Sequence, residues 1–268
     1  LSISNELTGL EPIDGGVFTI EEDRLDFFAL IKGQAGAIEW ETGLRYETTD
    51  QDVTDATVDP SLARSSNDYD FLMPSAHLRY DLTERDRGSA SVARTVRRPD
   101  FNFLTPALLE DEIAENDLQG NPLLDPETAW GFDVGYERRI GSRGIFGINF
   151  FYRDVQDKIE LTSTGEEGSE GPGSCIFTPG NIGDGWVRGV EFDLSAPLSI
   201  VNLNNTGIFA NLSFLDSEVD DPFGERQFND QSDWVYNAGF IQDLPALGAA
   251  FGATFRKQGD ATGRVLGE

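Results

Sequence analysis

The sequence is poor in the residues that build disulfides and metal centres. It contains one cysteine, Cys175, one histidine, His77, and one methionine among 268 residues. A single cysteine cannot form an internal disulfide, and one cysteine with one histidine is too few for an ordinary zinc site. We therefore expect no metal and no cofactor, and we interpret Cys175 as an unpaired thiol in a loop.

Basic residues are also scarce. The chain has 20 lysines and arginines against 48 aspartates and glutamates, which gives a formal net charge of -28. A protein that binds a phosphate backbone needs a basic surface that releases counterions. The composition therefore argues against a nucleic-acid partner.

Long apolar runs are missing as well. No stretch approaches the roughly 18 apolar residues of a transmembrane helix. The chain begins at Leu1 without a charged segment followed by an apolar one, so we expect an internal piece or a chain whose signal was removed. A membrane β-barrel stays open as an interpretation, because its strands need only about 9 to 11 residues of alternating pattern.

Alternation is the pattern that the sequence does show. The run AWGFDVGYERR from residue 129 puts Trp130, Phe132, Val134 and Tyr136 on one face and small or polar residues on the other. The same pattern recurs at residues 144–154, 187–195, 207–216 and 234–243, and it places His77 on a polar face. Helical periodicity is weak everywhere, with one candidate at residues 105–116. The pattern predicts an all-β chain.

The connections between these segments alternate between short and long. The short ones lie at residues 32–36, 83–87, 140–143, 196–206 and 244–248, and the long ones at 49–70, 97–128, 161–185 and 217–233. Loops longer than about 12 to 15 residues are uncommon in compact soluble domains. We therefore predict an antiparallel up-and-down transmembrane β-barrel of about ten strands, with all long loops at one end. Residues 144–160 read as one long strand, which favours the barrel over the alternative of a soluble β-sandwich.

The four long loops are strongly acidic. Together they hold 24 acidic and four basic residues, which is most of the excess negative charge of the chain. Solvated, mutually repelling loops explain this charge. Two alternatives are bridging by divalent cations at a lipopolysaccharide surface and steering of a cationic or metal-bearing ligand.

Three consecutive stretches carry a family resemblance. They are LMPSAHLRYDLTERDRGSASVARTVRRPDFNFLTP at residues 72–106, GNPLLDPETAWGFDVGYE at residues 120–137, and FFYRDVQDKIE at residues 150–160. In this order and spacing they resemble the barrel of TonB-dependent outer-membrane receptors, and the likeness covers roughly residues 20–258. The resemblance implies a barrel of about 22 strands closed by an N-terminal plug. It also implies energy-coupled uptake of a scarce ligand such as an iron-siderophore, cobalamin or an oligosaccharide.

The chain departs from the family in its extent. We find no plug and no TonB-contacting segment, and residues 261–268 lack a terminal strand with a final aromatic residue. Residues 1–268 are therefore expected to be an internal part of the barrel domain, in the outer membrane of a Gram-negative bacterium. The expected partners are an extracellular small ligand, outer-membrane lipid and lipopolysaccharide, and the TonB system acting through the missing N-terminal part. A passive porin or a surface-binding barrel is the alternative function.

No catalytic arrangement is recognisable, because no serine-elbow motif accompanies the single histidine, His77. We therefore expect that the chain is not an enzyme.

The candidate ligand contacts lie at two of the long loops. Arg97 and Arg98 stand where a strand ends at Pro99, whose nitrogen cannot serve the hydrogen-bond ladder. Pairing with carboxylates of the loop or with strand-end carbonyls is the alternative role for both arginines, and an interfacial position is the alternative for Trp186. The full set of candidates is Arg97, Arg98, Asp100, Asn102, Asn121, Trp186 and Arg188.

Overall fold

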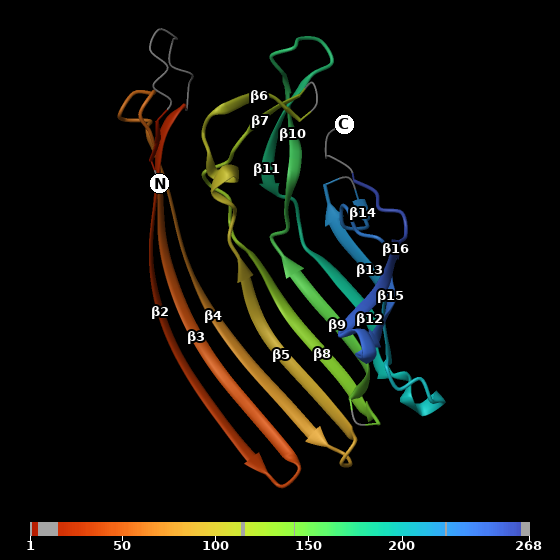
Figure 1. The fold of residues 1–268 in the computed structure, drawn as a ribbon. Coiled ribbons are helices and arrows are strands. Elements are labelled where there is room, and N and C mark those ends of the chain that lie inside the picture. The colour runs from red at the N-terminus through yellow and green to blue at the C-terminus, as the bar shows by residue number, and fades with distance from the viewer. Residues whose placement is uncertain (1, 5–15, 114–115, 142, 223, 264–268) are drawn as a thin grey trace.

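One curved antiparallel sheet forms most of the molecule. The computed structural model describes residues 2–4, 16–113, 116–141, 143–222 and 224–263 (Figure 1). Ten long strands follow one another in chain order, and the short strands β1 (Ser2–Ser4) and β14 (Gly224–Arg226) flank β2 and β13. The long strands are β2 (Val17–Ala35), β3 (Ile38–Asp55), β4 (Arg64–Asp81), β5 (Asp86–Arg97), β8 (Glu127–Ile140), β9 (Gly144–Gln156), β12 (Gly185–Pro197), β13 (Thr206–Asp221), β15 (Trp234–Leu244) and β16 (Ala249–Gln258).

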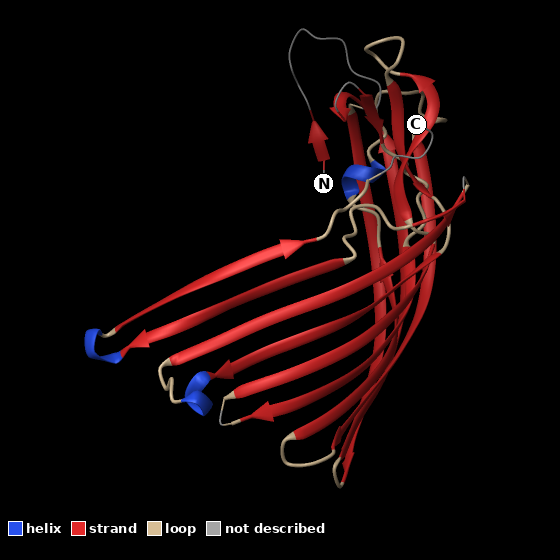
Figure 2. Cartoon of the chain, turned by 90° about the vertical axis from the view of Figure 1, so that its right-hand side faces the viewer, coloured by secondary structure: helices blue, strands red, loops and turns tan. Residues whose placement is uncertain are grey.

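The predicted antiparallel, up-and-down order is confirmed. Each long strand pairs with its neighbours in the meander, and the order ends at β1 on one side and at β16 on the other, as far as the chain is described. Figure 2 shows that the sheet is strongly curved and open. No helix in the described part is long and apolar enough to cross a membrane.

The register gathers the apolar side chains on one face of this sheet. A single row of paired residues runs across seven strands, through Leu78, Ala90, Val134, Phe150, Val190, Phe214 and Trp234. We call this the apolar face, and the opposite one the polar face. Val134 is 59% exposed and Phe150 47% exposed. Because covering such a side chain is worth about 1.5–3 kcal/mol, the apolar face suits an apolar surrounding rather than water.

The two ends of the sheet differ. One end carries tight connections, with Gly36 and Gly141 in left-handed conformation (φ 62° and 60°) in two hairpin turns. The connections after β12 and β15 contain the short 3-10 helices η2 (Leu198–Val201) and η3 (Pro245–Leu247). We call this the short-turn end and the opposite one the long-loop end.

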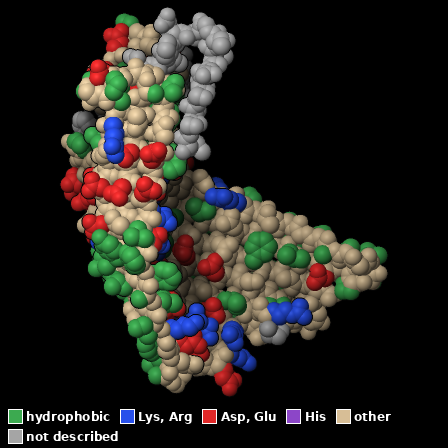
Figure 3. Space-filling view, turned by 90° about the vertical axis from the view of Figure 1, so that its left-hand side faces the viewer, with side chains coloured by type: hydrophobic (Ala, Val, Ile, Leu, Met, Phe, Trp, Pro, Cys, Tyr) green, Lys and Arg blue, Asp and Glu red, His purple; other side chains and the backbone are tan. Residues whose placement is uncertain are grey.

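The first predicted long loop, residues 49–70, is mostly strand. β3 and β4 stay paired from Thr54 and Arg64 downward, so that only residues 56–63 connect them. On the apolar face above the apolar residues, Asp50 lies opposite both Asp23 and Asp68. Figure 3 shows acidic side chains gathered above a hydrophobic patch on this side of the molecule. Like charges directly opposite each other weaken strand pairing, so the repulsion among these aspartates opposes the pairing of this hairpin.

The predicted continuous strand at residues 144–160 is wrong. β9 ends at Gln156, and Asp157 adopts a left-handed conformation (φ 56°) that turns the chain out of the sheet. The following strand, β10 (Ile159–Glu167), pairs with β11 (Cys175–Asn181) instead.

A second, four-stranded sheet is built from two of the long loops. Its order is β10, β11, β7 (Asn116–Gln119) and β6 (Leu108–Ile113), and β11 pairs with β7 in parallel. The helix suggested at residues 105–116 is therefore wrong in its described part, which contains strand β6. The 3-10 helix η1 (Phe101–Leu104) precedes this strand.

Side chains fasten the second sheet. The buried carboxylate of Asp117 accepts hydrogen bonds from the backbone nitrogen and hydroxyl of Ser169, at 2.7 and 2.8 Å. The Asn116 side chain accepts one from the backbone nitrogen of Cys175 at 2.8 Å. Since Asn116 and Asp117 belong to one loop and the other two residues to another, the two loops form one unit. Residues 264–268, which include most of the segment expected to lack a terminal strand, lie outside the described residues.

Candidate functional site

The loop between β5 and β8 folds onto the polar face of the sheet at the long-loop end. Gln51 of β3 donates a hydrogen bond to the carbonyl oxygen of Pro122 at 3.5 Å, and Asn67 of β4 donates one to that of Leu124 at 3.0 Å. Apolar side chains of the loop pack against the wall strands in a small buried core made of Phe18, Ile20, Val53, Leu104, Leu124 and Ile159. The polar face is therefore covered by the loop rather than left open at this end.

Beneath this loop lies a cluster of arginines and carboxylates that the sequence did not indicate. Arg45 contacts Asp26 at 3.1 Å and Glu47 at 2.9 Å, and Arg24 contacts Asp26 at 3.1 Å. Arg98 forms an ion pair with the same Glu47, whose side chain is only 2% exposed. Three arginines thus share two carboxylates within the wall of the sheet.

A second group of charges links the bases of three long loops. Glu127 pairs with Arg97 at 3.3 Å and with Lys158 at 3.5 Å, and Lys158 lies 3.8 Å from Glu160. Arg226 continues the chain, with contacts of 2.6 Å to both Glu160 and Asp221. We call these six residues the ion-pair chain. Burial opposes the charge of Arg226, but its hydrogen bonds to Glu160 and Asp221 raise its pKa above the usual value.

The sequence candidates in the β5–β8 loop fall into two groups. Arg97 and Arg98 are both held in ion pairs, as the structural alternative predicted. Glu127, the partner of Arg97, is within the predicted loop at residues 97–128 and starts β8, whereas Glu47, the partner of Arg98, stands on β3, two strands from β5. Asn121 is also committed, since it donates to the carbonyl oxygen of Pro179 and accepts from the backbone nitrogen of Leu123.

The other two candidates of this loop, Asp100 and Asn102, are exposed. The backbone carbonyl of Asp100 accepts a hydrogen bond from Phe103 at 2.8 Å, at the start of η1. Arg97 is exposed as well, with 61% of its side chain accessible, but unlike these two it is held in an ion pair.

Trp186 and Arg188 lie on the other face of the sheet. They alternate in register with Val190 and therefore belong to the apolar face, at its long-loop end. The Arg188 guanidinium stacks over the Trp186 ring at 4.7 Å and contacts Asp216 at 2.7 Å. The seven candidates consequently do not form one site. Trp186, Arg188 and Val190 are two residues apart in the sequence, so the alternation alone places them on one face. This spacing would have separated Trp186 and Arg188 from the five candidates of the β5–β8 loop.

Acidic residues also meet where β9 leaves the sheet. The backbone nitrogen of Asp157 donates to the Asp184 side chain at 3.1 Å. Burial and the nearby carboxylates of Asp184 and Asp125 raise the pKa of Asp157. In the described part of the chain, no group of three or more histidine, cysteine, aspartate or glutamate side chains is arranged to hold a metal ion.

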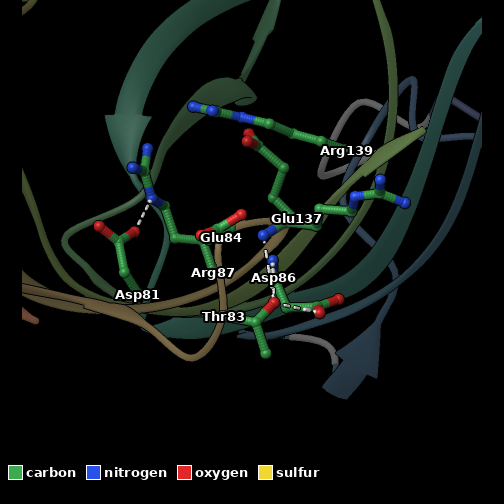
Figure 4. Close-up of a pocket in the computed structure, with 8 residues that line it drawn as sticks. Asp81, Thr83, Glu84, Asp86, Arg87, Glu137 and Arg139 are labelled. Carbon is green, nitrogen blue, oxygen red and sulfur yellow. Dashed lines mark hydrogen bonds and ion pairs between the residues drawn. The ribbon is translucent and has the colours of Figure 1, made fainter. Parts of the chain in front are cut away.

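At the short-turn end, a cavity of about 310 Å³ surrounds the turn between β4 and β5 (Figure 4). Arg87 reaches Asp81 across it at 2.6 Å, and Glu137 and Arg139 line it from β8. Figure 4 shows charges of both signs around the cavity. Because acids and arginines both line it, the cavity favours neither an anionic nor a cationic ligand. It also lies at the end opposite the long loops.

A family model described as "TonB dependent receptor-like, beta-barrel" matches residues 16–266. This chain belongs to the TonB-dependent receptor family. The match extends the expected range of residues 20–258 at both ends. The search of curated proteins found no match.

Solved TonB-dependent receptors share the fold. The copper transporter OprC superposes with a TM-score of 0.67 at 18% identity, over 88% of this chain and 35% of that chain. The siderophore receptor PirA from Pseudomonas aeruginosa gives 0.59 at 18% identity, over 90% and 49%. The alcaligin outer membrane receptor FauA from Bordetella pertussis gives 0.60 at 14% identity, over 91% and 38%. The chain thus spans between about a third and a half of the length of these receptors.

Proposed function

We propose that the chain is part of an outer-membrane receptor that takes up a scarce extracellular ligand with energy supplied through TonB. The observation that carries this proposal is the division of the sheet, within a family of outer-membrane receptors, into an apolar face and a polar face that a long loop covers. An apolar face of this kind suits bilayer lipid, and long loops of such barrels are extracellular. A passive porin, the alternative, would instead keep an open polar channel.

The rest of the barrel and the energy coupling are proposed to come from the remainder of a longer protein. We propose that residues 1–268 belong to one barrel domain of about 22 strands, with a plug and a TonB-contacting segment elsewhere in the receptor. The two open edges of the sheet support this, because a bilayer does not tolerate unpaired strand edges.

The surroundings of the apolar face are proposed to be outer-membrane lipid, with lipopolysaccharide above it. Trp186 suits the boundary between hydrocarbon and headgroups, and the neighbouring Arg188 suits the headgroup level. We therefore assign these two residues to the membrane boundary and no longer to the ligand site.

The ligand is proposed to be a metal complex, with an oligosaccharide as the second choice. The relatives described as a copper transporter and as siderophore receptors support a metal complex. Arg97, Arg98, Asp100, Asn102 and Asn121 stay proposed contacts around the covering loop. Since Arg97 and Arg98 are held in ion pairs, we propose that they act by shaping the loop.

Uptake measurements test the function. A strain lacking the gene, complemented with the full-length receptor, should accumulate a radiolabelled metal complex only when TonB and the proton gradient are intact. Reversing the charges of Arg97 and Arg98 should lower uptake while the barrel still assembles, because the covering loop loses its ion pairs. Energy-independent uptake would contradict a TonB-coupled receptor, and normal uptake by the charge-reversed receptor would contradict the role of the two arginines.

A further inference from the structure

An open cavity of about 530 Å³ lies where three loop segments meet at the long-loop end. The tip of the β3–β4 hairpin, the β5–β8 loop and the β10–β11 hairpin each contribute to it. Its wall residues Val53 and Ser65 belong to the polar face by register. The cavity therefore opens on the side of the sheet that the proposed function assigns to ligand entry.

The lining of this cavity combines apolar side chains, two uncharged polar ones and two acids. The apolar ones are Val53, Val58, Leu62, Ala63, Pro106, Leu108, Pro122 and Ile176, and the uncharged polar ones are Ser65 and Gln119. Leu62 is 77% exposed and Val58 37% exposed, so apolar surface at the mouth is left uncovered. Asp55 and Glu166 supply the acidic groups, and no lysine, arginine or histidine is among the described residues that line the cavity. Such a lining favours a ligand with an apolar body and a positive charge.

The arginines nearby do not reverse this preference. On the polar face at this end, each of five arginines forms an ion pair with a carboxylate of the wall strands or of the loop bases. They are Arg24, Arg45, Arg97, Arg98 and Arg226. The two long loops that help to line the cavity are also acidic, since residues 97–128 hold eight acidic and two basic residues and residues 161–185 hold four acidic and no basic ones. Their field attracts cations and repels anions within a Debye length of about 10 Å at 0.1 M salt.

We infer that this cavity binds a cationic amphiphile, a ligand with an apolar body and a positively charged group, and that it discriminates against anionic ligands. The inference rests on the proposed function for the identity of the cavity as a ligand site and adds the charge class of the ligand. Within the proposed class of metal complexes, it selects complexes with net positive charge.

Two dyes on one ring system test the charge class. Rhodamine 123 is a planar tricyclic cation, and fluorescein is an anion with the same ring core. Their binding to the purified full-length receptor, in a detergent with an uncharged headgroup, is followed by fluorescence anisotropy. We expect rhodamine 123 to bind about tenfold more tightly at low salt, and the preference to shrink as salt is added. Equal binding of both dyes, tighter binding of fluorescein, or a preference that salt does not change would overturn the inference.

Neighbouring residues supply matched variants. Glu166→Gln should weaken rhodamine 123 binding about two- to fivefold, whereas Glu167→Gln should not, because Glu167 does not line the cavity. Leu62→Ser should weaken binding of the dye, and Leu123→Ser, which alters another exposed leucine (61%) that does not line the cavity, should not. Equal effects within either pair would place the binding site outside this cavity and overturn the inference.

The binding assay separates this inference from the proposed function, because it needs neither TonB nor a proton gradient. Cation-selective binding without energy-dependent uptake would contradict the function and leave the inference standing. Energy-dependent uptake of anionic complexes without cation-selective binding would do the reverse.

Discussion

Replacing Arg226 by methionine should loosen the base of the loop between β13 and β15. The Arg226 side chain is 13% exposed and bridges Glu160, which is 8% exposed, and Asp221, which is fully buried. Methionine keeps much of the side-chain volume but removes the charge that offsets both acids. Breaking a buried ion pair by removing one partner costs about 3–5 kcal/mol. The equilibrium constant for local opening should therefore rise by roughly two to three and a half orders of magnitude.

Hydrogen exchange measures this opening directly. Backbone amides of residues 157–160 and 217–229 should lose protection in Arg226→Met, while amides of the β3–β4 pairing keep it. Arg188→Met is the matched control, because Arg188 also contacts an aspartate at 2.7 Å but both side chains are 54% exposed. The control should change opening by no more than about fivefold. Equal loss of protection in the two variants would contradict the reasoning, because it would mean that the buried ion pairs of Arg226 hold the loops no more strongly than an exposed ion pair does.

Three further predictions concern the membrane face, the close packing at a glycine, and an aspartate that lies near two other carboxylates. Phe150→Arg should impair barrel assembly, at a cost of about 2–4 kcal/mol at the bilayer midplane, whereas Asn149→Arg on the polar face should assemble, as checked by heat-modifiable gel mobility. Gly120→Ala should destabilise the β5–β8 loop, since a Cβ would clash with the backbone oxygen of Thr105, whereas Gly207→Ala meets nothing within 4 Å and should be neutral in thermal unfolding. Asp157→Asn should stabilise the protein at pH 7 more than at pH 3, because the raised pKa of Asp157 disfavours the charged form only above its unfolded value of about 3.9. Equal stabilisation by this last variant at both pH values would contradict that account, and asparagine tolerates the left-handed backbone of the site.

The strands of the sheet were predictable because their two faces differ. Alternation around Phe132 and Val134 identified β8 and its orientation, and the same signal identified the later strands. It failed between residues 49 and 70, where acidic residues such as Asp50 and Asp68 occupy the face that is apolar lower down. A strand with polar residues on both faces has no contrast to detect, so the long β3–β4 hairpin could not be recognised.

The candidate site was predictable only in part, because its contacts join distant parts of the chain. That Arg98 would be paired followed from the acidity of its surroundings, but Glu47 as the partner depends on how the loop folds back onto β3. The cavity is harder still, since Leu62, Pro106 and Ile176 meet only after the second sheet has formed. Parallel pairing between two separate loops leaves no periodic signal in either of them.

The shared sheet of β6, β7, β10 and β11 limits how the surface of this receptor can change. Loops of a barrel usually vary one at a time, because each returns to the wall where it began. Here a substitution at Asp117 alters the anchor of Ser169 in the other loop, so the two segments must evolve together. An exchange of surface loops between two receptors would have to transfer residues 98–126 and 157–184 as a pair, because either one alone would lose the β7–β11 pairing and the hydrogen bonds of Asn116 and Asp117 to the other loop.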